Sequence, residues 1–152
     1  MKAICVLHPN NNGITGIIKF IEVDNKVEVY YNIKGLSDGL HGFHVHEYGD
    51  LTDGCTNACA HFNPFNTNHG GRNSKERHVG DLGNIESIDG VASGHFTDNI
   101  ISLNYKKKTC IVGRAIVIHQ DEDDLGLGGN KESLKTGNAG KRLGCGVIGI
   151  CK

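Results

Sequence analysis

The sequence lacks tryptophan, contains only two prolines, and has no long hydrophobic run among its 152 residues. The apolar stretch at residues 2–8 is too short for the core of a signal peptide, and no small-residue cleavage site follows it. No other stretch approaches the length of a membrane span. We therefore expect a cytoplasmic protein that has no membrane partner.

An excess of charge of one sign is also missing. The 16 basic and 17 acidic residues leave a net charge of -1 with neutral histidines. A general affinity for nucleic acid or for an anionic membrane is therefore not expected, and any functional electrostatic field must be local. The length fits a single domain over residues 1–152 with its own core.

Glycine is abundant, with 22 residues, and this favours many short strands joined by turns. Residues 26–34 alternate apolar and polar side chains, which is typical of a half-buried strand. The sequence predicts turns at 10–13, 24–25 and 89–90, and no convincing helix. Eight strands are expected, at residues 2–8, 14–22, 26–34, 41–47, 81–89, 91–97, 109–119 and 143–150. The predicted fold is all-β, an antiparallel sandwich or barrel.

Two long segments, 48–80 and 120–142, show neither strand nor helix periodicity. Loops of this length are uncommon in compact domains and are usually functional. The first contains three histidines, and the second begins acidic and ends basic. We expect both to be functional loops.

Potential metal ligands cluster in and before the first of these loops. His44 and His46 alternate along a strand, so both point to one face as a preorganised clamp. Imidazole suits copper and zinc, and zinc also accepts a carboxylate. The candidate ligands are His44, His46, His61, His69, His78 and Asp81, with His119 from a later strand. A lone histidine is more often an ordinary surface or core residue, and this interpretation is kept for His8, His41 and His95.

The chain resembles the Cu/Zn superoxide dismutases, in particular their intracellular eukaryote-type branch. The resemblance covers essentially the whole chain, in order and with family-like spacing. Its motifs are Gly42–Asp50, His61–Pro64, His69–Gly71, Arg77–Gly83 and Lys135–Gly149. It implies an eight-stranded antiparallel Greek-key sandwich or barrel with two long functional loops, an architecture for which this family is a known example.

The resemblance also implies one copper and one zinc per subunit. Copper would be held by His44, His46, His61 and His119, and zinc by His61, His69, His78 and Asp81. His61 would bridge the two metals. The implied activity is dismutation of superoxide to oxygen and hydrogen peroxide by redox cycling of copper, beside a structural zinc.

Further roles follow from the same resemblance. Asp123 would link His44 to His69, Arg142 would orient the anion, and Thr136 would narrow its channel. Electrostatic guidance would come from Lys131, Glu132 and Lys135. Family members commonly have an acidic residue where Lys131 stands and a small polar one where Leu134 stands. The change at Lys131 either steepens the salt dependence of superoxide attraction or is neutral.

Six cysteines are present, and from the residues alone Cys5, Cys110 and Cys151 are interpreted as small buried apolar side chains. The resemblance implies a disulfide between Cys55 and Cys145. Cys59 and the following alanine stand where the family usually has glycine and proline. Cys59 is either an inert thiol, a competitor of Cys55 for Cys145, or a transient copper ligand.

The implied partners are superoxide, a second copy in a homodimer, and a copper chaperone. The segments that match the family's dimer contact are Ile4 and Val6, Gly49–Leu51, Val112–Gly113 and Gly149–Ile150. Two alternatives remain: a copper-binding or delivery module without significant catalysis, and a structural sandwich with vestigial metals. The complete ligand set and Arg142 argue against the first alternative, and Asp123 and Thr136 argue against the second.

Overall fold

Eight β-strands form the framework of the computed structural model, which describes residues 1–9 and 12–152. Their bounds are β1 Lys2–Leu7, β2 Thr15–Val23, β3 Lys26–Lys34, β4 Gly39–His46, β5 Asp81–Ser87, β6 Val91–Asp98, β7 Ala115–His119 and β8 Arg142–Ile150. The helical elements are a 3-10 turn, η1 (Thr56–Ala58), and one short helix, α1 (Ser133–Thr136). None of the helices in the described ranges is long and apolar enough to cross a membrane.

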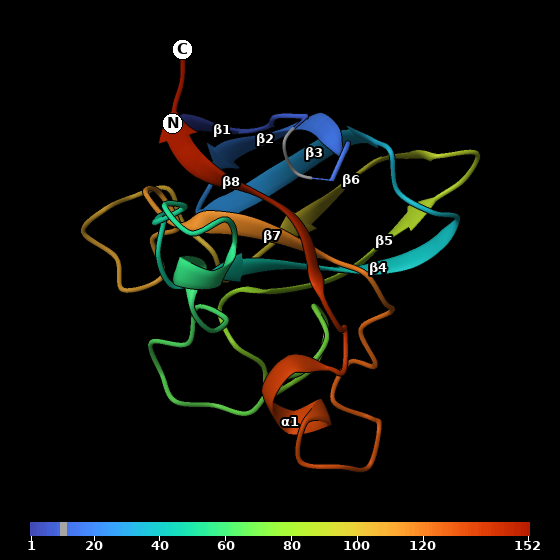
Figure 1. Cartoon of the computed structure of the whole chain (residues 1–152). Coiled ribbons are helices and arrows are strands. Elements are labelled where there is room, and N and C mark those ends of the chain that lie inside the picture. Colours follow the sequence, from blue (N-terminus) through green and yellow to red (C-terminus); the bar gives the residue numbers. More distant parts are fainter. Residues whose placement is uncertain (10–11) are drawn as a thin grey trace.

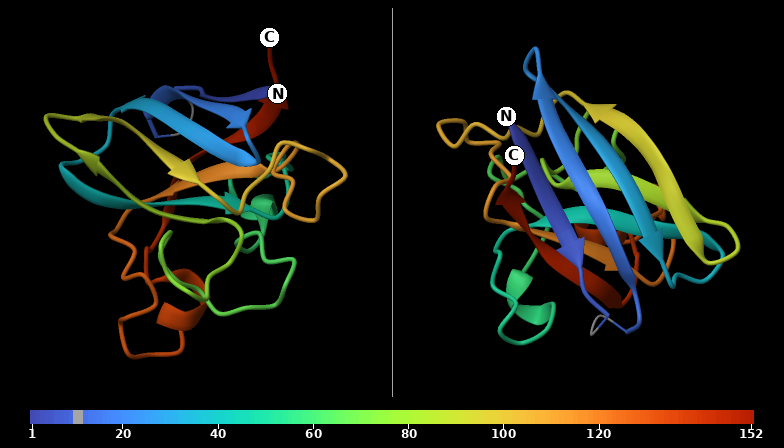
Figure 2. Two further views of the ribbon diagram at one scale, coloured as in Figure 1. Left: turned by 180° about the vertical axis from the view of Figure 1, so that it is seen from behind. Right: turned by 90° about the horizontal axis from the view of Figure 1, so that it is seen from above.

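All eight strands form one antiparallel sheet in the order β5-β4-β7-β8-β1-β2-β3-β6. The two outermost strands, β5 and β6, are joined by a hairpin, so the sheet curls into a nearly closed barrel (Figures 1 and 2). The β4–β7, β8–β1 and β3–β6 neighbours are not consecutive, and the β3–β4 and β6–β7 connections cross the ends of the barrel. The all-β, eight-stranded prediction is confirmed.

Strand alternation places the core inside this barrel. On β3, Val27, Val29 and Ile33 are fully buried, whereas Lys26 and Lys34 are exposed. The interior is filled by the aliphatic side chains of facing strands and by large aromatic ones such as those of β2 and β4. Burial of this apolar surface is the main force that closes the sheet.

Tight turns confirm two of the sequence predictions. Asp24 and Asn25 between β2 and β3, and Asp89 between β5 and β6, all have positive φ, as two-residue hairpin turns require. The turn expected at 10–13 falls partly outside the described residues. The strand expected at 109–119 was too long, since β7 begins only at Ala115. A turn hydrogen bond from Arg114 and the left-handed Gly113 (φ +82°) break the extended chain before it.

Both long loops lie on the same side of the barrel, at the bottom of Figure 1. Gly42 on β4 allows the second loop to approach, because a Cβ there would lie 2.7 Å from the Cβ of Ala139. The Gly42 N–H donates to the Asp121 carbonyl over 2.9 Å. The loop around residues 120–141 therefore packs directly on the strand that carries the first two histidines.

The first loop is anchored by covalent and ionic contacts. The predicted disulfide between Cys55 and Cys145 is present and ties this loop to β8. Near the other end of the loop, buried Arg77 forms an ion pair with Asp98 of β6 at 2.7 Å. Arg77 also donates to backbone carbonyls of its own loop, which leaves little freedom to the residues around it.

Candidate metal centre

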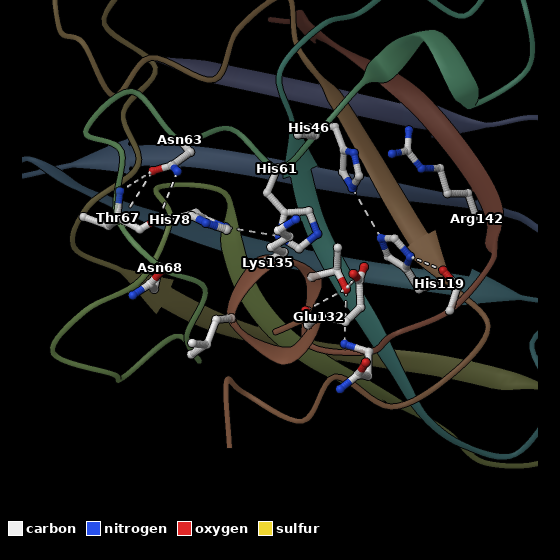
Figure 3. A pocket seen from close by; sticks show the side chains of 15 residues that line it. His46, His61, Asn63, Thr67, Asn68, His78, His119, Glu132, Lys135 and Arg142 are labelled. Atoms are coloured by element: carbon white, nitrogen blue, oxygen red, sulfur yellow. Dashed lines mark hydrogen bonds between the residues drawn. The ribbon is translucent and has the colours of Figure 1, made fainter. Parts of the chain in front are cut away.

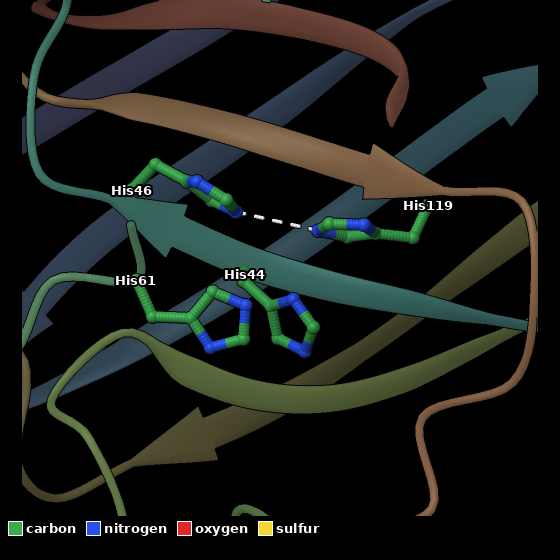
Figure 4. Close-up of side chains that lie close together, drawn as sticks. All are labelled: His44, His46, His61 and His119. Carbon is green, nitrogen blue, oxygen red and sulfur yellow. Dashed lines mark hydrogen bonds between the residues drawn. The ribbon is translucent and has the colours of Figure 1, made fainter. Parts of the chain in front are cut away.

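Four imidazoles converge from three parts of the fold. His44 and His46 lie on β4, and His119 ends the neighbouring β7. His61 follows in the first loop, where its backbone forms an isolated β-bridge with that of His46. All four are buried, and each offers a nitrogen within 4.8 Å of the others (Figure 4). Strand register therefore sets most of this group, which we call the copper group.

Backbone carbonyls select which nitrogen of two members faces the group. The Nδ1 of His46 contacts the Cys59 carbonyl at 2.8 Å, and the Nδ1 of His119 contacts the Gly140 carbonyl at 3.1 Å. Because a carbonyl only accepts, both Nδ1 atoms carry the proton and both Nε2 atoms present lone pairs. These Nε2 atoms lie 3.3 Å apart (dashed line in Figure 4). Two facing lone pairs are satisfied by a cation between them.

Asp123 selects the nitrogen in the same way at two other histidines. Its carboxylate accepts from the Nε2 of His44 and from the Nε2 of His69, each at 2.7 Å. The Nδ1 atoms of both histidines are then buried without a hydrogen-bond partner, and so is the Nε2 of His61. A buried polar atom left unpaired costs about 1–3 kcal/mol. Three such atoms in one cluster fit a site that binds metal cations.

The second group contains His61, His69, His78 and Asp81, and we call it the zinc group. The Oδ2 of Asp81 accepts from the backbone N–H groups of Gly70 and His78. Its Oδ1 faces the Nδ1 atoms of His61, His69 and His78 at 2.9, 3.0 and 3.1 Å. The contact between Asp81 and His69 lacks hydrogen-bond geometry. The carboxylate oxygen and the three ring nitrogens are instead arranged as ligands around one metal ion.

The two groups differ in charge preference. Burial opposes ionisation of Asp81, but the close contacts of three histidines with its carboxylate hold its pKa well below the usual range. Burial also opposes charge on His69, yet its contacts with Asp123 and Asp81 raise its pKa to about 9. The zinc group therefore favours a bound cation.

The copper group favours neutral imidazoles. Burial, reinforced by the neighbouring histidines, lowers the pKa of His44 and His46 well below the usual value. Burial likewise lowers the pKa of His119 to about 4. Neutral imidazole is the form that binds a metal.

The donor sets match the two metals. Three imidazoles with one carboxylate are a common tetrahedral set for zinc, and four imidazoles suit copper. His61 belongs to both sets, because its Nδ1 faces the zinc group while its Nε2 remains for the copper group. The geometry thus brings together all seven ligands predicted from the sequence.

A cavity of about 610 Å³ opens onto the copper group. His46, His61 and His119 lie at its base beside Arg142, and Glu132 and Lys135 approach from the α1 region (Figure 3). Arg142 is fixed by hydrogen bonds to the carbonyls of Cys55 and Cys59. The lining set also includes Thr136, whose hydroxyl donates to the Glu132 carboxylate, whereas Lys131 is exposed beyond it.

Comparison with known proteins agrees with the copper and zinc donor sets described above. Residues 14–148 match the family model described as "Copper/zinc superoxide dismutase (SODC)". The chain belongs to the copper/zinc superoxide dismutase family.

Relatives within this family align over nearly the whole chain. The superoxide dismutase [Cu-Zn] of Paramecium bursaria Chlorella virus 1 is 58% identical, over 100% of this chain and 80% of its own length. Superoxide dismutase [Cu-Zn] A of Xenopus laevis is 53% identical over 99% of both chains. The extracellular superoxide dismutase [Cu-Zn] of Brugia pahangi is 51% identical, over 97% of this chain and 75% of its own length. Similarity therefore fixes the family and leaves the cellular location open.

The cysteines follow the predictions in part. Cys5 is fully buried, which raises the pKa of its thiol to about 12, whereas Cys110 and Cys151 are only half-buried because they lie outside the strands. Cys55 pairs with Cys145, so Cys59 does not replace it here. Cys59 is an exposed thiol with φ +60° and ψ −143°, and its carbonyl is used by His46 and Arg142.

Three supporting residues were not predicted. Buried His41 contacts the His119 carbonyl and the Ser37 carbonyl, both at 2.8 Å. A side chain at Gly137 would overlap the Asp123 carboxylate, so glycine is required there. Asn84 holds the backbone of Asp123. In the sequence His41 and Asn84 look like ordinary core and strand residues, because their partners His119 and Asp123 lie far away along the chain. Gly137 lies within the motif Lys135–Gly149, but its role became visible only in the structure.

Proposed function

We propose that this protein removes superoxide by dismutation, with metals held by the seven ligands of the copper and zinc groups. The enzyme class, a Cu/Zn superoxide dismutase with copper and zinc as cofactors, follows from family membership. The observation that carries the proposal is the pair of buried ligand groups sharing His61, with three unpartnered imidazole nitrogens. Copper, when bound, supplies the one-electron redox chemistry of both half-reactions, whereas zinc has no redox role.

Arg142 is the proposed binding residue for the substrate anion. Its guanidinium lines the cavity and is held by two carbonyls, so its orientation is set before an anion arrives. A fixed fork of N–H donors suits a small oxyanion. Thr136 and the Glu132 carboxylate narrow the approach, and Lys135 adds positive charge at the rim.

His61 is the proposed proton carrier. Dismutation of two superoxide ions consumes two protons, so a donor beside the substrate is required. His61 lines the cavity, and its Nδ1 is fixed by Asp81 while Nε2 has no hydrogen-bond partner. Whenever it is not bound to copper, Nε2 could therefore take up a proton and deliver it to the reduced oxygen species.

A substitution of Lys131 tests the proposed electrostatic guidance of superoxide into the cavity. Exposed charges act over about 10 Å at 0.1 M salt, and Lys131 is the chain neighbour of the cavity-lining Glu132. We expect Lys131→Glu to lower the rate about twofold at low ionic strength and to flatten its salt dependence. Equal ionic-strength slopes for the two proteins would show that the substitution is neutral.

A homodimer is proposed from exposed apolar side chains on two paired strands. Val6 on β1, and Val147 and Ile150 on β8, are each more than a third exposed. Sedimentation equilibrium of the purified protein tests this proposal, and a monomer at micromolar concentration would contradict it. Supply of copper by a chaperone and a cytoplasmic location are further predictions that family membership alone does not decide.

The proposed activity is tested by adding copper to zinc-loaded protein. Superoxide decay is followed while copper is added up to one equivalent per chain, and metal content is measured in parallel. Decay should accelerate in proportion to bound copper and level off at one equivalent. A copper-binding or delivery module would bind the copper and leave superoxide decay unchanged.

A further inference from the structure

Asp123 occupies a central position between the two metal groups. One carboxylate oxygen accepts from His44 of the copper group and the other from His69 of the zinc group, each at 2.7 Å. Asp123 is buried, yet it lies in the loop between β7 and β8 and belongs to no strand. Something other than sheet register must therefore hold its backbone in place.

Asn84 of β5 contacts both polar groups of the Asp123 backbone. Its Oδ1 accepts from the Asp123 N–H at 2.8 Å, and its Nδ2 donates to the Asp123 carbonyl at 2.9 Å. A side-chain amide used in this way acts like the backbone of a neighbouring strand. Because both groups are held at once, the peptide at residue 123 cannot rotate without losing two hydrogen bonds.

The consequences reach both metal groups. The Asp123 carboxylate fixes a proton on the Nε2 atoms of His44 and His69, which directs their Nδ1 lone pairs into the two groups. Residues that orient metal ligands typically change metal affinity by about 10–100-fold. We propose that Asn84 is a positioning residue for copper and zinc together, acting through Asp123. This inference rests on the metal assignment of the proposed function.

The chain contains a second clasp of the same chemistry. Asn63 donates from Nδ2 to the Thr67 carbonyl and accepts the Thr67 N–H on Oδ1, both at 3.0 Å. The Thr67 hydroxyl donates to the Arg77 carbonyl at 2.7 Å, so this clasp shapes the first loop without linking the two groups. Asn63→Ala is therefore a matched control, since it removes an equal pair of hydrogen bonds elsewhere.

The experiment is a double-mutant cycle on metal affinity. Zinc and copper dissociation constants are measured by chelator competition for wild type, Asn84→Ala, Asp123→Ala and the double variant. The visible spectrum of bound Cu(II) is recorded for each protein. Asn84→Ala should weaken both metals about 10-fold and shift the Cu(II) band. In the Asp123→Ala background, Asn84→Ala should change neither quantity further, because its route to the ligands is already lost.

Two results would overturn the proposal. One is wild-type affinity for both metals in Asn84→Ala. The other is a double variant whose loss of metal affinity equals the product of the losses in the two single variants. A Cu(II) shift in Asn63→Ala equal to that of Asn84→Ala would reduce the role of Asn84 to general support. If Asn84→Ala fails to fold, Asn84→Asp serves instead, because it keeps the acceptor for the Asp123 N–H and loses the donor. Absence of metal binding in wild type would reject the proposed function itself.

Discussion

The metal centre has two halves that are built by different means. The strand half consists of His44 and His46 on β4 with His119 at the end of β7, and hydrogen-bonded strand register holds it. The loop half runs from His61 to Asp81, the first residue of β5, and residues 62–80 have no regular secondary structure. Individual side-chain contacts hold the loop half instead: the Cys55–Cys145 disulfide, the Arg77 ion pair and the hydrogen bonds of Asp81.

This difference has a physical consequence. The strand half is set by folding of the barrel and should keep its geometry when a metal is lost. The loop half brings together four charged or ionisable side chains whose mutual packing is satisfied only by a cation. We therefore expect substitution of a metal ligand in the strand half to lower the rate of superoxide removal. Substitution of a ligand in the loop half should lower both that rate and the free energy of unfolding.

The largest effect is expected from His46→Ala in the strand half. Loss of this copper ligand should lower superoxide removal about 1,000-fold, which corresponds to about 4 kcal/mol. Zinc content and the β-sheet circular dichroism spectrum should be retained, because β4 keeps its backbone pairing. His95→Ala, which removes an exposed histidine of β6, is the control and should keep full activity. Loss of zinc together with activity in His46→Ala would contradict the separation of the halves.

Cys145→Ser releases the covalent anchor of the loop half. The disulfide spans a sequence separation of 90 residues, and its loss should lower the free energy of unfolding by about 4 kcal/mol. Urea unfolding of the metal-loaded proteins measures this change. Cys151→Ser, at a free and half-buried thiol, controls for removal of sulfur. A decrease below about 1 kcal/mol would show that the loop is held without the disulfide.

Asp81→Asn weakens the loop half directly. The substitution keeps the size of the side chain but removes the charge that faces three histidines. Zinc affinity should fall about 100-fold and copper affinity by less than about 10-fold, because only His61 is shared. Chelator competition gives both constants. Equal losses for the two metals would mean that the groups cannot be separated.

Cys59→Gly should stabilise the protein. Cys59 has a backbone conformation that favours glycine, and such strain costs of order 1 kcal/mol. The carbonyl that serves His46 and Arg142 is retained, so activity per copper should not change. A rise of about 1 kcal/mol in the free energy of unfolding is expected, and thermal unfolding measures it. A lower free energy of unfolding in Cys59→Gly would instead show that the Cys59 thiol makes a contact that stabilises the fold by more than the backbone strain costs.

The sequence predicted the sheet well because strand periodicity is a local signal. The alternation in β3 and the turns at Asp24 and Asp89 depend only on neighbouring residues. The metal ligands were found through clustering and family resemblance. Asn84 was missed because its partner Asp123 is 39 residues away, and a polar residue in a strand normally indicates a solvent-facing position. The four-residue helix α1 is too short to leave a helical period in the sequence.

The central claim is that His61 joins the two halves into one centre. The most direct test is to compare the copper dissociation constant of the zinc-free and zinc-loaded protein, with binding to the copper group followed by its Cu(II) absorption. Zinc should tighten copper binding at least about 10-fold, because it fixes the ring of His61 toward the copper group. Equal copper affinity in the two forms would contradict the account.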